Sequence, residues 1–344
     1  MVDRAYYVNA GAGSIVGHFC NINTEDIVLD IKTAIYNGYK TILFDNTYEA
    51  VYFDIIKKIH RIVNIINVPD IEYIYFCSAQ NGIETYSQFC KENNITEILK
   101  ILSVSVFENT TKEYLVDFYN KTNYPVIEYK QGIKPKLFCC FNKAVREHRI
   151  GIFYNILKNQ LLGKTYSSFY YGKEVTDRLR QSRQPEMFKM FKKYYNIFPL
   201  TLNMPNGRDN PVDVRIDDLK YHANSYFSLV TETLFFKNDV HAGNSIFLTE
   251  KTFRPVIHKH PFILVSTANS LTHLRKLGYK TFSPYINEHY DTIENDEDRF
   301  NAVWAEVERL CAFSNSEWLE WQKGIVDIVN YNYEVLTTKT DYLL

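Results

Sequence analysis

Short apolar runs alternate with segments of helical spacing along the first part of the chain. The apolar runs predict strands at residues 5–9, 41–44, 71–77, 100–106 and 125–129. Apolar residues recur every three or four positions in the intervening segments, which predicts helices at 25–37, 49–63, 82–92 and 111–119. Strands that alternate with helices favour a parallel sheet covered by helices.

The pattern starts again after residues 131–135, where Gly132 and Pro135 fall together and predict a linker. Strands are then predicted at 136–141, 166–170, 225–231 and 261–266. Helices are predicted at 144–160, 185–195, 249–259, 269–277, 296–313 and 317–336, and a long polar loop at 196–221. Because 344 residues exceed one ordinary core, we predict an α/β protein of two Rossmann-like domains, 1–133 and 134–315. The last segment, 316–344, is predicted as a separate C-terminal helix.

Composition removes several classes of protein. The 39 Lys and Arg nearly balance 40 Asp and Glu, giving a net charge of −1, whereas proteins dedicated to nucleic acids usually carry a basic excess. The six cysteines form no C-x-x-C pair, so we expect no zinc site and a reducing compartment. The N-terminus lacks the apolar core of a signal peptide, and no run approaches the roughly 20 apolar residues of a membrane span. We expect a cytoplasmic protein.

A glycine-rich turn, Asn9-Ala-Gly-Ala-Gly-Ser-Ile-Val-Gly17, follows the first predicted strand. Gly11 and Gly13 are typical of a dinucleotide-binding loop, although the third glycine does not have the spacing of the strict NAD fingerprint. Asp45 ends the second strand at about the distance of the acid that binds the ribose of NAD. An NAD(P)-dependent oxidoreductase is therefore one hypothesis. The other is a tight turn that faces the acceptor or the donor phosphates of a transferase.

Basic side chains crowd the start of the helix predicted after residues 136–141. Arg146, His148 and Arg149 lie in or next to its first turn, where positive charge opposes the helix dipole. Anion binding is one reason to accept that cost, because the guanidinium group forms paired hydrogen bonds with phosphate oxygens. We therefore predict that Arg146 and Arg149 contribute to a phosphate site.

A second charged helix start is the segment Phe247-Leu-Thr-Glu-Lys-Thr-Phe-Arg-Pro255. Thr249 is placed to cap the helix, and Glu250 and Lys251 lie in its first turn, with Arg254 three residues later. Lys suits phosphate and Glu suits ribose hydroxyls, while the helix N-terminus itself favours an anion. Upstream, Glu232 ends the strand at 225–231, and ligand-binding groups gather at the carboxyl ends of such strands.

Other polar groups suggest metal ions more weakly. His258 and His260 form an H-x-H pair, but no third ligand has a recognisable spacing, so we interpret them as a helix-end feature. The acidic residues Asp217-Asp218 and Asp296-Glu-Asp298 are interpreted as structural, the second group as a helix N-terminus.

Taken in order, several segments resemble the donor domain of GT-B glycosyltransferases related to the fucosyltransferase and exostosin-like groups, phage and giant-virus members included. They are 138–149, 227–233, 247–255, 261–265, 277–282 and 287–291. The resemblance covers roughly residues 136–310, and its most specific part is Thr249-Glu-Lys251. It departs at Val256-Ile-His-Lys-His260, which is bulkier than the small residues usual there.

The resemblance implies a glycosyltransferase that takes a sugar from a GDP- or UDP-linked donor without a metal ion. It also implies that the C-terminal helix in 316–344 crosses back to the first domain. Glu250 would bind the ribose, Lys251 and Arg146 would neutralise the diphosphate, and Glu232 would lie near the transferred sugar. In an inverting reaction a carboxylate would act as base, and Glu232 and Asp45 compete for that role. The acceptor is expected to be a glycan. A hydroxymethylated base in viral DNA is the alternative acceptor, and a catalytically silent sugar- or nucleotide-binding protein is the non-enzyme alternative.

Overall fold

The computed structural model describes residues 5–10, 16–122, 128–142, 144–169, 175–177, 179, 185–198, 200, 202, 219–237 and 242–340. They form two compact units. The first comprises Met1–Asn109, Phe236–Leu248 and Thr340–Leu344, and the second comprises Thr110–Phe235 and Thr249–Lys339. Residues 110–133, which we placed in the N-terminal domain, therefore belong to the second unit, while the segment 236–248 belongs to the first.

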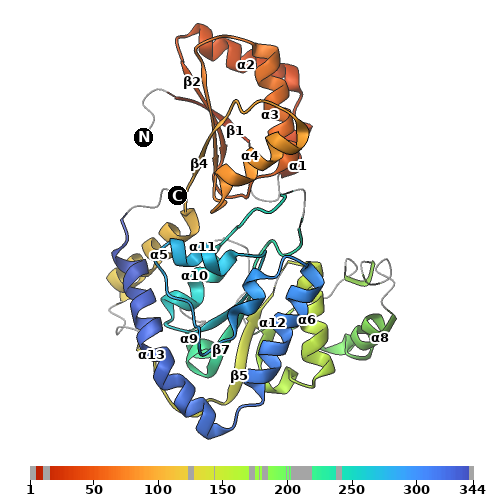
Figure 1. Ribbon diagram of the computed structural model, residues 1–344, viewed down its shortest axis with the longest axis vertical. Helices are drawn as coiled ribbons and strands as arrows, with labels where there is room; N and C mark the ends of the chain where they lie inside the picture. The colour runs from red at the N-terminus through yellow and green to blue at the C-terminus, as the bar shows by residue number, and fades with distance from the viewer. Residues whose placement is uncertain are drawn as a thin grey trace. The chain divides into compact units, whose positions relative to one another are not determined.

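A parallel sheet with helices along one side forms the first unit. Its elements are β1 (Ala5–Asn9), α1 (Val16–Asn21), α2 (Thr24–Tyr36), β2 (Thr41–Asn46), α3 (Phe53–Ile66), β3 (Glu72–Cys77), α4 (Gly82–Asn93) and β4 (Lys100–Ser103). The strand order is β1-β2-β3-β4. Right-handed crossovers that always step to the next strand place their helices on one face, and Figure 1 shows α2, α3 and α4 on one side of the strands.

Alternating burial explains the core of this unit. Ile42 and Phe44 on β2 are fully buried, as are Ile55, Ile59 and Ile62 on α3. Residues two apart in a strand, and three or four apart in a helix, lie on one face. Each element therefore has one row of buried side chains that faces the core. The predicted start of α3 at residue 49 is too early, because a turn follows β2 and the N-cap at residue 52 still has extended backbone angles.

The segment 236–248 docks onto the loop before α4 through paired hydrogen bonds. The Gln80 backbone N–H donates to the Ile246 carbonyl at 2.8 Å, and the Leu248 N–H donates to Gln80 Oε1 at 2.8 Å. The Ile246 N–H donates to Asn81 Oδ1 at 2.7 Å. A part of the chain that precedes α10 is thereby fixed to the first unit.

The second unit is built on another parallel sheet. Its strands and helices are α5 (Val106–Thr122, which begins in the first unit), β5 (Lys136–Phe141), α6 (Glu147–Lys158), β6 (Tyr166–Ser168), α8 (Pro185–Lys193), α9 (Leu219–Ala223), β7 (Ser225–Thr231), α10 (Glu250–Ile257), β8 (Phe262–Val265), α11 (Ser270–Lys276), α12 (Asp296–Cys311) and α13 (Asn315–Thr338). The strand order is β6-β5-β7-β8. The predicted α/β class with two Rossmann-like domains is confirmed, and β1, β5 and β7 have the predicted bounds. The strand predicted at 125–129 is not seen: residues 125–127 lie outside the described residues, and 128 and 129 belong to no strand.

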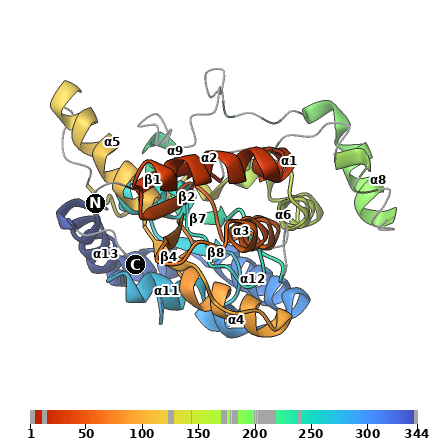
Figure 2. The same cartoon turned by 90° about the horizontal axis from the view of Figure 1, so that it is seen from above.

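Helices cover both faces of this second sheet. Figures 1 and 2 show α13 on one side of β5 and β7, and α6 and α12 on the other. The Trp318 ring near the start of α13 stacks on Tyr226 of β7 with centroids 3.9 Å apart. The C-terminal helix, for which we predicted a return to the first domain, is thus packed within the second unit. No helix among the described residues is both long and apolar enough to cross a membrane.

Candidate functional site

The strand order of the second sheet alone indicates where a ligand would bind. The chain leaves β5 for β6 on one side of it, but leaves β7 for β8 on the opposite side. Loops that depart in opposite directions open a crevice at the carboxyl ends of the two strands, where α/β proteins bind ligands. The loop that begins at Asn142 follows β5, and the loop that begins at Glu232 follows β7. Both carry residues that the sequence analysis predicted to be functional.

Glu232 is fully buried and accepts hydrogen bonds from five donor groups. Its Oε1 accepts from the Thr249 N–H at 2.9 Å and from Thr252 Oγ1 at 2.6 Å. Its Oε2 accepts from Thr249 Oγ1 at 2.7 Å, from the Thr233 N–H at 3.1 Å and from Lys251 Nζ at 3.4 Å. The carboxylate therefore fastens the N-terminus of α10 to the end of β7.

These contacts also determine the charge of Glu232. Burial by itself raises the pKa of this carboxyl, but the ion pair with Lys251 and the hydrogen bonds from Thr252 and Thr249 outweigh it and lower the pKa below its ordinary value. Glu232 is thus ionised at neutral pH. A buried carboxylate whose lone pairs already face five donors is better suited to position α10 than to take a proton from a substrate.

Thr249 caps α10 as predicted, since its side chain accepts a hydrogen bond from the Lys251 N–H. Lys251 Nζ lies 3.2 Å from Glu250 Oε1, in addition to its pair with Glu232. The Lys251 side chain is 24% exposed and that of Glu250 is 13% exposed. Both are therefore within reach of a ligand, and both are already oriented by their ion pair.

Arg149 is buried, in contrast to the predicted role at a phosphate site. Its guanidinium donates to the Ala144 carbonyl at 3.0 Å and to the carbonyls of Thr231 and Glu232 at 3.1 and 3.0 Å. Burial lowers its pKa to about 10 despite the nearby Glu232 carboxylate. His148 Nε2 donates to the same Glu232 carbonyl at 2.9 Å. Arg149 and His148 thus tie the start of α6 to the end of β7 across the crevice.

Arg146 is the N-cap residue of α6 and has extended backbone angles, φ −140° and ψ 151°. It is half-buried, and its Nε is buried without a hydrogen bond inside the described part of the chain. Its charge helps to lower the pKa values of His148 and Arg149, behind the larger effect of burial on each. Arg146 therefore lies beside these residues and remains the basic group of α6 that is best placed for an anion.

A cavity of about 30 Å³ opens next to the first turns of α10. Its wall includes Lys251, Arg254, Thr231 and Phe141, so two basic residues of the predicted motif and the last residues of β7 and β5 share one surface. This volume holds one or two water molecules. A nucleotide would therefore lie outside the cavity, against the strand-end loops.

The residues predicted to be functional in the first unit form no comparable site among the described residues. Asp45 lies near the end of β2 beside Asn9 of β1, and its Oδ1 accepts from the Thr47 N–H at 3.0 Å and from the Thr47 hydroxyl. Gly11 and Gly13 lie outside the described residues. The order β1-β2-β3-β4 does not reverse among the described strands, so they form no switch-point crevice of the kind that binds NAD.

The acidic residues predicted to be structural are part of a helix start where the structure describes them. Asp296 and Asp298 lie in the first turn of α12, and Asn295 accepts from the Asp298 N–H. Asp296 pairs with the buried Arg299 at 2.6 Å. Asp217 and Asp218 lie outside the described residues.

Thr252, which donates to Glu232, was not predicted to be part of the site. The signal was present, because Thr249 and Thr252 are three residues apart and face the same side of a helix. Finding it required knowing that the same side meets the end of β7.

No protein-family model and no curated protein matches the sequence. Two similar solved structures are UDP-forming α,α-trehalose-phosphate synthases. The one from Burkholderia vietnamiensis has 10% identity and a TM-score of 0.43, covering 90% of this chain and 70% of that chain. The one from Burkholderia xenovorans has 9% identity and a TM-score of 0.42 with the same coverage. A likeness at this level does not identify an activity.

Proposed function

We propose that the protein is a GT-B-type glycosyltransferase whose second unit binds a UDP- or GDP-linked sugar at the carboxyl ends of β5 and β7. The observation that carries the proposal is the meeting of two helix N-termini there. Arg149 and His148 tie the start of α6 to the Glu232 backbone, and the Glu232 carboxylate holds the start of α10. Two positive helix ends are thus directed at one crevice.

The charges around this crevice suit a diphosphate. Arg146, Arg149, Lys251 and Arg254 are buried or half-buried basic residues at these helix starts, and Lys251 pairs with Glu232 and Glu250. We infer that Lys251 and Arg146 contact the phosphates directly and that Glu250 turns to the ribose hydroxyls. Neutralisation by fixed basic groups also stabilises the departing diphosphate without a metal ion at that position.

In the proposed reaction an acceptor hydroxyl attacks the anomeric carbon and the nucleoside diphosphate leaves. Glu232 is assigned a positioning role, because its carboxylate is occupied by five donors. Asp45 in the first unit then remains our prediction for the base of an inverting reaction. Asp45→Asn should lower turnover and leave the dissociation constant of the donor unchanged; equal turnover would remove Asp45 from the mechanism.

Nucleotide binding is the direct test. We expect UDP or GDP to bind, measured by calorimetry, and NAD⁺ not to bind. Lys251→Met and Glu250→Gln should each weaken the nucleotide by about 10-fold or more, since a hydrogen bond to a charged group contributes roughly 1.5–3 kcal/mol. Lys189→Met is the matched control, because Lys189 is 72% exposed and pairs with Glu186 on the surface of α8.

Two results would overturn the assignment. One is unchanged nucleotide affinity in both crevice variants while each remains folded by circular dichroism. The other is tight NAD⁺ binding that Asp45→Asn abolishes, which would favour the oxidoreductase hypothesis. Binding without any donor hydrolysis or transfer would instead favour a silent nucleotide-binding protein.

For the acceptor we propose a glycan. The net charge of −1 does not favour DNA, whose binding requires basic contacts with phosphates. Transfer of a labelled sugar to a panel of glycans, compared with duplex DNA containing hydroxymethylated cytosine, distinguishes the two acceptors. Labelled DNA without labelled glycan would contradict the glycan proposal.

A further inference from the structure

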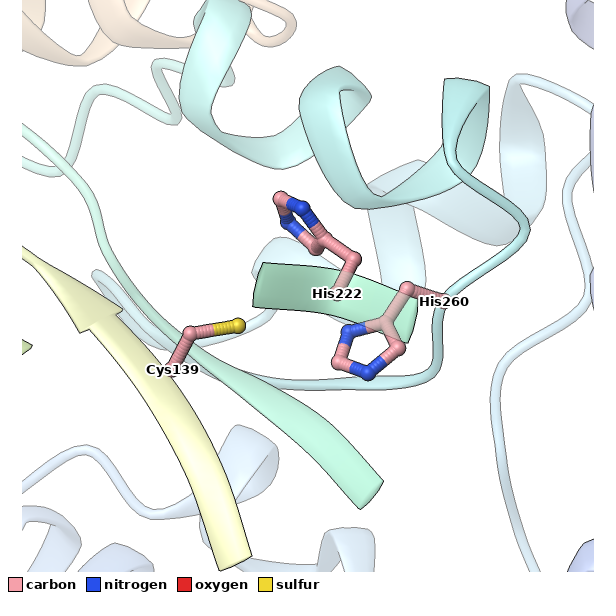
Figure 3. Close-up of side chains that lie close together, drawn as sticks. All are labelled: Cys139, His222 and His260. Atoms are coloured by element: carbon pink, nitrogen blue, oxygen red, sulfur yellow. The ribbon is translucent and has the colours of Figure 1, made fainter. Parts of the chain in front are cut away.

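Three metal-binding side chains from distant parts of the sequence come together inside the second unit. Cys139 lies on β5, His222 on α9, and His260 between α10 and β8. Their nearest donor atoms all lie within 4.8 Å of one another. In Figure 3 the Cys139 thiol points toward the two imidazole rings. All three residues are buried, with exposures of 1%, 2% and 3%.

The hydrogen bonds of His260 prepare one of its nitrogens for a metal ion. Nε2 lies 3.0 Å from the Ser225 carbonyl, which can only accept, so Nε2 carries the proton. Nδ1 is then the unprotonated nitrogen, 2.8 Å from Ser228 Oγ. A ring that donates to a carbonyl through one nitrogen and offers the other to the ion is the usual arrangement of a histidine ligand.

His258 provides a second observation at the same place. It is 5% exposed, and its ring lies 4.5 Å from that of His222. Both ring nitrogens are buried and make no hydrogen bond within the described part of the chain. A buried polar atom normally finds a partner, so an unpaired imidazole beside three clustered ligands indicates a missing group.

We propose that Cys139, His222 and His260 bind a zinc ion, with His258 as the nearest further donor. One thiolate and neutral imidazoles are the ligands that zinc favours in proteins, usually in a four-coordinate site. The thiolate offsets one of the two positive charges. Coordination of the thiolate releases a proton, so binding should strengthen with rising pH.

The zinc site lies further along β7 than the proposed donor site, and Cys139 and His222 line the same small cavity as Lys251 and Arg254. His260 contacts Ser225, the first residue of β7, and Cys139 is paired in register with Ser228. Glu232 follows the opposite end of β7. At about 3.3 Å per residue, Ser228 and Glu232 are roughly 13 Å apart along the strand. The ion would therefore act structurally, by joining β5, α9 and the connection from α10 to β8.

A hydrogen-bonded cluster without an ion is the competing interpretation. Ser228 Oγ lies 2.8 Å from His260 Nδ1 and 3.4 Å from Cys139 Sγ, so its hydroxyl can donate a hydrogen bond to one of them. This cluster leaves the nitrogens of His258 without a hydrogen bond inside the described part of the chain. A zinc ion replaces the Ser228 contact and allows His258 to join as a ligand.

Metal binding to the chelator-stripped full-length protein tests the proposal. We expect one equivalent of Co²⁺ with a thiolate-to-cobalt absorption band, and Zn²⁺ should displace it stoichiometrically and raise the melting temperature. Cys139→Ser should remove the band and weaken Zn²⁺ by at least about 100-fold, more than the loss of a supporting hydrogen bond costs. His260→Gln should weaken Zn²⁺ similarly. Cys140→Ser is the control, because this neighbouring buried thiol contacts Asn142 instead.

Several outcomes would overturn the zinc site. They are the absence of stoichiometric Co²⁺ binding by the wild-type protein, a retained thiolate band in Cys139→Ser, and loss of the band in Cys140→Ser. The first needs no variant, so it decides the question even where a substitution prevents folding. Nucleotide binding is a separate measurement, so either proposal can fail alone.

Discussion

Replacing Glu232 by Gln tests whether this carboxylate positions α10 or takes part in the chemistry. Gln has the same shape and retains Oε1, which accepts from Thr249 and Thr252. Its amide nitrogen takes the place of Oε2, however, and then faces Thr249 Oγ1, the Thr233 N–H and Lys251 Nζ, of which the last two can only donate. A buried acceptor is exchanged for a donor beside two groups that are themselves donors.

The cost follows from these contacts. Leaving the Thr233 N–H without an acceptor costs about 1–3 kcal/mol. The pair with Lys251 adds about 1 kcal/mol or less, because that side chain is 24% exposed and water screens it. Glu232→Gln should therefore lower the free energy of unfolding of the second unit by about 3 kcal/mol. Glu250→Gln, which removes a single ion pair, should cost less than about 1 kcal/mol.

Tryptophan fluorescence in urea measures this change selectively. The three tryptophans, Trp304, Trp318 and Trp321, all lie in the second unit, so their signal reports its unfolding. With a slope of about 3 kcal/mol per M, the midpoint should fall by roughly 1 M urea. A midpoint within about 0.3 M of wild type, together with lost transferase activity, would refute the positioning role and favour Glu232 as the base.

The pH dependence gives a second measure of the same interaction. The pKa of Glu232 is lowered in the folded protein, so its ionised form stabilises the fold at pH values above the ordinary carboxyl pKa of 4.5. That contribution is lost as the pH falls through the lower pKa of the folded state. The difference between wild type and Glu232→Gln should therefore be largest near neutral pH and shrink in acid. A difference that stays constant down to pH 3 would contradict this explanation.

Two further substitutions test the packing around the site. Arg149→Met removes the hydrogen bonds from the guanidinium to three backbone carbonyls, of which that of Glu232 keeps the hydrogen bond from His148. It should cost roughly 3 kcal/mol in the same urea assay, whereas Lys158→Met on the exposed side of α6 should be neutral; equal midpoints would contradict the clamp between α6 and β7. Trp318→Ala removes a ring that is 2% exposed and stacked on β7, and should cost about 3–5 kcal/mol by calorimetry, compared with less than about 1 kcal/mol for Leu319→Ala, which is 41% exposed; similar values for both would show that α13 is not packed against the sheet.

Local sequence patterns predicted most of the secondary structure because their causes are local. The apolar runs at 136–141 and 225–231 became β5 and β7 with unchanged bounds. Thr249 was predicted as an N-cap from its position before a charged helical segment, and its side chain does cap α10. These features depend on neighbours within a few residues, where spacing and side-chain chemistry are visible in the chain itself.

Domain assignment and the roles of buried charges depended on distant contacts. Residues 236–248 belong to the first unit because Gln80 and Asn81, far away in the sequence, bind their backbone. Arg149 was predicted to face phosphate, yet it satisfies carbonyls at the end of β7. A cation in a first turn looks the same in the sequence whether solvent, a ligand or another strand end lies opposite.

The sequence by itself determined the α/β alternation and the two charged helix starts, since both arise from short-range periodicity and composition. Only the tertiary structure decided that these helix starts meet where the order β6-β5-β7-β8 reverses. It also brought Cys139 within reach of His222 and His260, although no ligand spacing in the sequence indicated a metal. Sheet order and contacts between distant residues are set by packing across the whole unit, which no local pattern records.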